Sequence, residues 1–87
     1  MTLAELRREL AKLDHLPEDT IVVLSNDAEG NGFSPLYEVD ASMYRAQTEW
    51  SGEHYMTEAA RQAQVNPDDY TKAPANVVPA ICLWPTH

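Results

Sequence analysis

Four oxygen-bearing side chains in one polar loop have spacing that could bind a hard cation. In the stretch SNDAEGNGFSPLYE, Asp27, Glu29 and Asn31 occupy alternate positions, Gly32 follows, and Glu38 comes six residues later. This D-x-E-x-N-G-x5-E spacing is close to that of a calcium-binding loop, in which alternate oxygen ligands wrap the ion and a final glutamate binds through both oxygens. Calcium is therefore one candidate ligand of this loop.

The surroundings of the loop favour a hairpin turn instead. A calcium loop of this kind lies between two helices, whereas this one lies between two segments with strand patterns, and Pro35 occupies its ninth position. Gly30 and Gly32 flank Asn31, and these residue types tolerate positive φ and form turns. We predict a turn, keep calcium as the alternative, and expect no other cofactor.

Nucleophiles and soft metal ligands are few. The three histidines and the single cysteine have no zinc-site spacing, and one cysteine excludes an internal disulfide. Cys82 stands between Ile81 and Leu83, which indicates a small buried apolar residue rather than a nucleophile. No Ser-His-Asp set has a recognisable local signature, and no glycine-rich phosphate loop precedes a helix. We expect no enzymatic activity.

Aromatic side chains in polar surroundings are stronger candidates for function. Trp50 lies in TEWSGE, where no periodicity explains its burial, and Arg45 and Tyr55 are near it in sequence. Exposed aromatic residues and arginines concentrate binding energy in interfaces. We predict a binding site made of Trp50, Arg45, Tyr55 and Phe33. The alternative is that Trp50 forms a lid packed over a sheet.

Composition limits the classes of partner. The 87 residues predict one domain (1–87), and the formal charge is −8. Its six basic residues are scattered along the chain, which argues against generic nucleic-acid binding. There is no apolar stretch of about 18 residues and no leader pattern, so we expect a soluble, unprocessed chain without membrane binding. Such a small chain buries little apolar surface, which makes a homo-oligomer an attractive expectation.

The elements that must position these residues follow from periodicity. Thr2 and Glu5 form a capping-box pattern before leucines at helical spacing, and β-branched or alternating apolar residues mark the strands. The predicted order is helix 2–13, strand 20–25, acidic loop 26–36, strand 37–44, irregular insertion 45–76 with a short helix near 57–64, and strand 77–84. The predicted class is α+β, a small and mainly antiparallel three-stranded sheet with the N-terminal helix on one face.

Three segments together resemble a group of small phage and prophage proteins. These segments are DAEGNGFSPL, TEWSGEHY and a terminal apolar strand ending in LWP. The group shares a D-x-E-G-N-x-[FY]-S-P-L loop, a W-S-G-E segment and a final V-L-W-P. Gly32 stands where small polar residues are common, and CLWP replaces a more aliphatic ending. The resemblance implies a phage-encoded accessory protein in the bacterial host cytoplasm and supplies no catalytic or ligand residues.

The sequence therefore predicts a non-enzymatic interaction protein that binds and modulates a bacterial host protein, with counter-defence as its candidate role. Two alternatives remain open. One is an oligomeric sponge that sequesters a nucleotide immune signal, with Trp50 and Tyr55 stacking on the base and Arg45 pairing with a phosphate. The other is a calcium-stabilised accessory domain.

Overall fold

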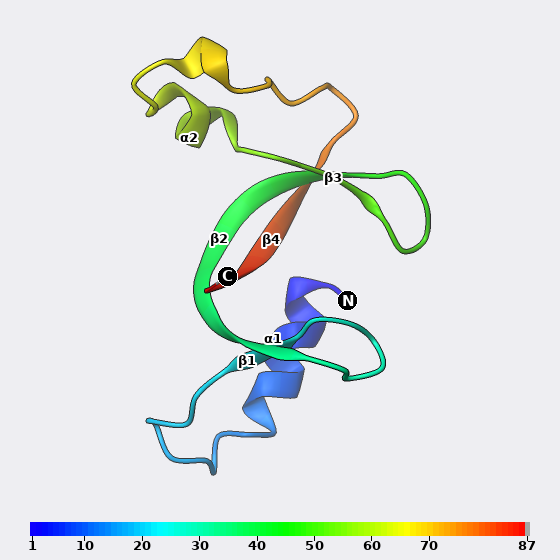
Figure 1. Cartoon of the computed structure of the whole chain (residues 1–87), viewed down its shortest axis with the longest axis vertical. Helices are drawn as coiled ribbons and strands as arrows, with labels where there is room; N and C mark the ends of the chain where they lie inside the picture. Colours follow the sequence, from blue (N-terminus) through cyan, green and yellow to red (C-terminus); the bar gives the residue numbers. More distant parts are fainter. Residues whose placement is uncertain (87) are drawn as a thin grey trace. The chain divides into compact units, whose positions relative to one another are not determined.

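Helices and strands alternate irregularly along the chain (Figure 1). The computed structural model describes residues 1–86. In chain order the elements are α1 (Leu3–Ala11), β1 (Val23–Ser25), β2 (Phe33–Ala46), β3 (Gly52–Tyr55), α2 (Glu58–Gln62), the 3-10 helix η1 (Pro67–Asp69) and β4 (Val78–Pro85). This arrangement confirms the predicted α+β class with an N-terminal helix.

The long strand β2 joins the other strands into one sheet, because β1, β3 and β4 all pair with it. β1 runs antiparallel to the start of β2, with Val23 opposite Pro35. β3 runs antiparallel to its end, with Arg45 opposite Glu53. The alternating residues predicted at 37–44 lie in the middle of β2, which extends further than predicted at both ends.

The sheet has a fourth strand, β3, where the sequence predicted an irregular insertion. Only four residues long, β3 contains Gly52 and Glu53, which are both uncommon in strands. It also lacks the alternation of apolar and polar residues that marked the other strands. Its pairing with β2 determines its conformation, and the strand propensities of its four residues do not reveal this pairing.

Both α-helices begin where the sequence places a threonine cap. The Thr2 hydroxyl accepts a hydrogen bond from the Glu5 backbone N–H at 3.2 Å and donates one to its carboxylate at 3.1 Å. Thr57 likewise accepts from the Ala60 N–H at 3.1 Å. These bonds satisfy backbone donors that have no partner inside the helix, which fixes the start of each helix.

Arg61 holds together the segment that follows β3. Its side chain, only 11% exposed, forms ion pairs with Glu58 at 3.0 Å and Asp68 at 3.5 Å. Its Nε donates to the Tyr70 carbonyl at 3.1 Å. One arginine thus links α2, η1 and the chain beyond them, so part of the insertion predicted as irregular has a defined structure.

The chain forms two compact units whose boundary falls inside β2. The first contains Met1–Glu38 and the end of the chain from Pro85, and the second contains Val39–Trp84. Among residues 1–86 no apolar side chain is fully buried, and Ser42 is the only buried residue. The leucines of α1 are partly exposed, with Leu3 42% and Leu10 55% exposed.

Candidate binding site

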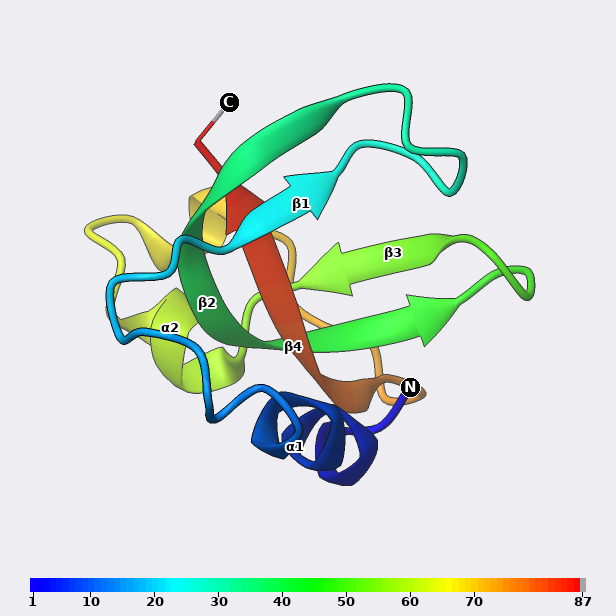
Figure 2. The same cartoon turned by 90° about the horizontal axis from the view of Figure 1, so that it is seen from below.

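The hairpin formed by β2 and β3 displays Trp50 at its tip. The two strands lie side by side and end in the loop Gln47–Ser51 (Figure 2). Backbone N–H groups of Gln47 and Thr48 both donate to the Ser51 carbonyl, at 2.9 and 3.0 Å. The loop is thereby closed by the backbone itself.

The hydroxyl groups of the loop fix its conformation further. The Thr48 hydroxyl lies 2.7 Å from that of Ser51 and accepts the Trp50 backbone N–H at 3.2 Å. Short polar side chains stabilise turns by bonding to nearby backbone groups in this way. The backbone that carries Trp50 is consequently held by its neighbours on both sides.

The Trp50 side chain points away from the protein. It is 85% exposed, which makes it the most exposed aromatic residue among residues 1–86. The interpretation of Trp50 as a lid over the sheet is therefore wrong. A large apolar side chain on an ordered loop is a candidate contact for a partner.

Two of the other predicted site residues join in one network on the hairpin stem. The Glu53 carboxylate accepts hydrogen bonds from Arg45 at 3.1 Å and Gln47 at 2.7 Å, and also from the Tyr55 hydroxyl. The Tyr55 hydrogen bond, with the charge of Arg45, lowers the pKa of Glu53. The same hydrogen bond raises the pKa of Tyr55. Arg45 and Tyr55 are thus brought together as predicted, by a glutamate that the sequence did not single out.

The opposite face of the hairpin has an aromatic support that sequence reasoning missed. The Tyr44 ring lies over Gly52, where any Cβ atom would overlap the ring and crowd the Arg45 carbonyl. An aromatic side chain over a strand glycine replaces the packing that glycine lacks. Beside them, His54 and Trp84 meet edge to face, with ring centroids 5.2 Å apart. The glycine in WSGE was the available signal for this close approach.

Phe33 lies outside this hairpin. It is the first residue of β2 and pairs with Ser25 in the first unit, with its side chain largely exposed. Of the predicted site, the structure therefore links Arg45 and Tyr55 through Glu53 and places Trp50 at the tip of the same hairpin.

The acidic loop forms a turn that uses its own carboxylate. Asp27 accepts backbone N–H groups of Glu29 at 2.9 Å and Asn31 at 3.2 Å, and these bonds lower its pKa. Gly30 adopts φ of 75°, which glycine tolerates, and Asn26 N–H donates to the Gly32 carbonyl at 2.8 Å. The predicted turn is present.

The four calcium candidates are distributed differently from a calcium shell. The Asp27 carboxylate accepts hydrogen bonds within the turn, and Asn31 Nδ2 approaches Glu29 at 3.5 Å. Glu38 lies exposed within β2. Within residues 1–86 no three His, Cys, Asp or Glu side chains gather closely enough to hold a metal ion. The calcium alternative remains a prediction, to be checked by the melt described in the Discussion.

Cys82 is partly buried in β4. Burial raises the pKa of its thiol, and the charge of Asp40 raises it further. A raised pKa keeps the thiol protonated at neutral pH and therefore a poor nucleophile. Its surroundings suit a packing residue.

Comparisons with known proteins found no match: no family model, no curated protein and no solved structure matches the chain. Within residues 1–86, the helices are all too short or too polar to cross a membrane.

Proposed function

We propose that this chain is a non-enzymatic binding protein that inserts Trp50 into a pocket of a bacterial host protein. The observation that carries the proposal is the display of an 85% exposed tryptophan on a hydrogen-bonded hairpin tip. Tryptophan is the residue type most enriched at the energetic centre of protein interfaces.

The rigid loop favours binding over incidental exposure. Ordering a flexible loop and its side chains reduces affinity, because each immobilised side chain costs about 0.5–1.5 kcal/mol. Here the Thr48 and Ser51 bonds have already fixed the backbone around Trp50. Most of the ordering cost therefore falls on folding rather than on association.

The charges on the hairpin stem support a binding role rather than an acid–base role. A general acid or base works best with a pKa near the operating pH. The lowered pKa of Glu53 and the raised pKa of Tyr55 move both groups away from neutrality. Arg45 is also engaged by Glu53, so a nucleotide phosphate would have to displace that carboxylate. Binding of a protein partner is the function that this geometry favours.

The origin and the partner class depend on the phage resemblance of the loop, the WSGE segment and the terminal LWP. A phage accessory protein acts on host components, and a chain with a formal charge of −8 associates fastest with a partner that presents a basic surface. We therefore expect a host protein with an apolar pocket bordered by basic residues, and an association rate that falls with rising salt concentration.

The experiment is capture from bacterial lysate with tagged wild type, Trp50→Ala and Val65→Ala, followed by calorimetry with the captured partner. Val65 is the matched control, because it is 96% exposed and apolar but belongs to the turn after α2. We expect wild type and Val65→Ala to bind one host protein equally. Trp50→Ala should bind it at least 30-fold more weakly, corresponding to about 2 kcal/mol for an interface hot spot.

A second variant distinguishes the effect of the ordered loop backbone from the effect of the indole side chain. Thr48→Ala removes the side-chain acceptor of the Trp50 N–H while leaving the indole in place, so affinity should fall several-fold rather than 30-fold. Equal capture by wild type and Trp50→Ala would refute the proposed anchor. Purification with a bound nucleotide, and no host protein, would favour the sponge alternative.

A further inference from the structure

Asn31 in the acidic loop directly precedes a glycine, and we propose that it is a site of spontaneous covalent modification by deamidation. In this reaction the backbone nitrogen of the next residue attacks the carbon of the asparagine side-chain amide. The next residue is Gly32, which has no Cβ atom to hinder the approach of its nitrogen. The inference concerns the first unit of the chain and does not depend on the proposed role of Trp50.

The turn leaves the attacking nitrogen available in the folded chain. Asn31 is exposed and Gly32 is partly exposed. The hydrogen bonds of the turn use other groups: the Asn31 N–H donates to Asp27 at 3.2 Å, and the Gly32 carbonyl accepts from Asn26 at 2.8 Å. Within residues 1–86 the Gly32 N–H donates to no acceptor. No hydrogen bond therefore has to break before this nitrogen reacts.

The amide that would be attacked is also weakly held. Its Nδ2 approaches the Glu29 carboxylate at 3.5 Å, which is longer than an ordinary hydrogen bond between nitrogen and oxygen. Rotation of the Asn31 side chain toward the following residue consequently gives up little interaction energy.

The reaction balances with water as its only co-reactant. A new bond forms between the Gly32 nitrogen and Cγ of Asn31, which closes a succinimide ring, and the amide nitrogen leaves as ammonia with the proton of the attacking nitrogen. Water then opens the ring at either carbonyl carbon. One product is aspartate, and the other is isoaspartate, in which the main chain runs through the β-carbon. Nothing is oxidised or reduced, and the loop gains one negative charge.

The other asparagines of the chain serve as internal controls, because they are exposed as well but precede residues with side chains. Asn66 precedes Pro67, whose nitrogen has no proton to lose. Asn76 precedes Val77, whose β-branched side chain crowds its own backbone. Asn26 precedes an aspartate. We therefore expect the reaction at the asparagine before glycine and at none of these three.

Deamidation would alter the turn that joins β1 and β2. A carboxylate at this position cannot donate to Glu29, and it would add a like charge beside Asp27 and Glu29. The isoaspartate product also lengthens the main chain between the Asn31 N–H and the Gly32 carbonyl, which are two of the groups that hold the turn. The modified hairpin should therefore be less stable than the original one.

The test is incubation of the full chain at physiological temperature, followed by peptide mapping with mass spectrometry at intervals. We expect only the peptide containing Asn31 to gain the mass that replaces an amide with a carboxyl group, with isoaspartate among the products. The rate should rise with pH, because attack requires the backbone nitrogen to lose its proton. Gly32→Ala is the matched variant, since a Cβ atom there meets only the flexible Asn26 side chain, at 2.9 Å. It should slow the reaction at least about 10-fold.

The same proteins in urea give the reference rates without the turn. The slowing by Gly32→Ala should persist there, so the variant is informative whatever its folded stability. Wild type in its folded state should react within about 10-fold of its rate in urea, and stronger protection would overturn the proposal. An unmodified Asn31, equal modification of all four asparagines, or equal rates for wild type and Gly32→Ala would also overturn it.

Discussion

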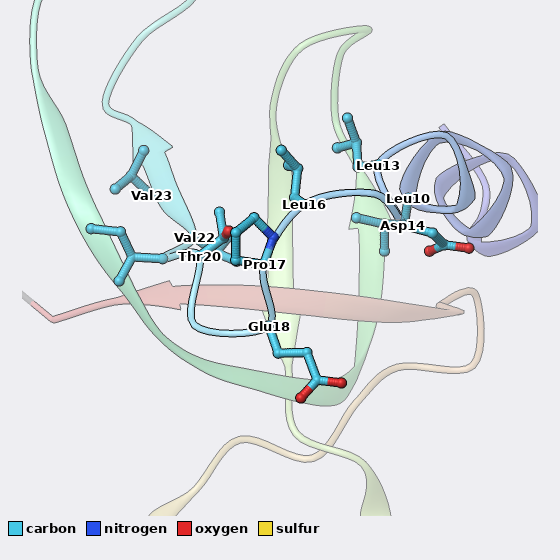
Figure 3. A pocket seen from close by; sticks show the side chains of 10 residues that line it. Leu10, Leu13, Asp14, Leu16, Pro17, Glu18, Thr20, Val22 and Val23 are labelled. Carbon is cyan, nitrogen blue, oxygen red and sulfur yellow. The ribbon is translucent and has the colours of Figure 1, made fainter.

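The Trp50 hairpin and a groove between α1 and β1 both expose apolar side chains, but their backbones are held in place in different ways. The apolar residues that line this groove are Leu10, Leu13, Leu16, Ile21, Val22 and Val23 (Figure 3). At the hairpin tip one large side chain stands on a loop closed by four hydrogen bonds within residues 47–51. Along the groove aliphatic side chains follow a connection held by backbone bonds, such as Leu16 N–H to the Leu13 carbonyl and Leu36 N–H to the Val22 carbonyl, both at 3.0 Å. At the hairpin tip hydroxyl side chains add to the backbone bonds, whereas the bonds along the groove join backbone groups.

This difference separates two reasons for exposing apolar surface. A single aromatic residue on a rigid loop suits a site that meets its partner after folding, because little order must be gained on binding. Aliphatic residues that are each two-fifths or more exposed contribute less to stability than buried ones, because only the part of a side chain that is removed from water adds apolar burial. The comparison of Leu13 with Trp50 tests this contrast directly, and three other predictions concern the hairpin stem and the acidic loop.

The largest expected effect is at Gly52, on the hairpin stem. Gly52→Ala places a Cβ atom into the Tyr44 ring and against the Arg45 carbonyl, so we expect a loss of about 3 kcal/mol in unfolding free energy. Chemical denaturation measures it. Gly30→Ala is the control, because its positive φ should cost only about 1–2 kcal/mol. If Tyr44→Ala does not reduce the cost of Gly52→Ala in a double-mutant cycle, the overlap with the ring is not its cause.

The second prediction compares the unfolding free energy of a variant in the groove with that of a variant at the hairpin tip. Leu13→Ala should lower the unfolding free energy by about 1 kcal/mol, because Leu13 is half exposed and loses only part of a leucine's burial. Trp50→Ala should change it by less than about 0.5 kcal/mol, as expected for an exposed residue outside the core. Chemical denaturation of both variants distinguishes them. A stability of Leu13→Ala that equals wild type would contradict the contrast.

A smaller effect is the acid sensitivity of the hairpin stem. Because hydrogen bonding to Tyr55 and the charge of Arg45 lower the pKa of Glu53 from its ordinary 4.5, the ionised form stabilises the folded state above that pH. This contribution is lost as the pH falls through the lower folded-state value. The melting temperature of wild type should therefore decrease below pH 4.5, and Glu53→Gln should flatten the decrease. An identical acid profile for the two proteins would argue against the network.

The smallest expected effect is that of calcium on the acidic loop. Asp27 already accepts backbone N–H groups, and a calcium ion would have to compete with them. We expect millimolar calcium, or its removal by a chelator, to leave the melting temperature unchanged. A calcium-dependent rise that disappears in Glu29→Gln would establish the calcium site instead.

Local signals in the sequence predicted the helices better than the sheet. Thr2 and Thr57 mark helix starts through bonds to residues three positions away, so a short window contains the cause. β3 depends on pairing with β2, and nothing within GEHY itself specifies it. β1 is shorter than predicted because the run Ile21–Leu24 could not show which of its residues pair and which face the groove.

The sequence predicted residues of the candidate site, but not the hydrogen bonds that link them. Trp50 was identified by its polar surroundings, and its exposure agrees with the binding interpretation rather than the lid. The link between Arg45 and Tyr55 runs through Glu53, which lies eight residues from Arg45 and reaches it only across the hairpin register. Sequence spacing alone could not reveal that register, because it follows from a strand that the pattern did not predict.

The two tryptophans have different surroundings, so the intrinsic fluorescence of the protein can report binding at Trp50. Trp50 is 85% exposed, whereas Trp84 is 37% exposed and meets His54 edge to face. The emission of a water-exposed indole lies at longer wavelength than that of a sheltered one, and soluble quenchers reach it more easily. A partner that encloses Trp50 should therefore shift the emission to shorter wavelength and protect it from quenching, without any label on either molecule.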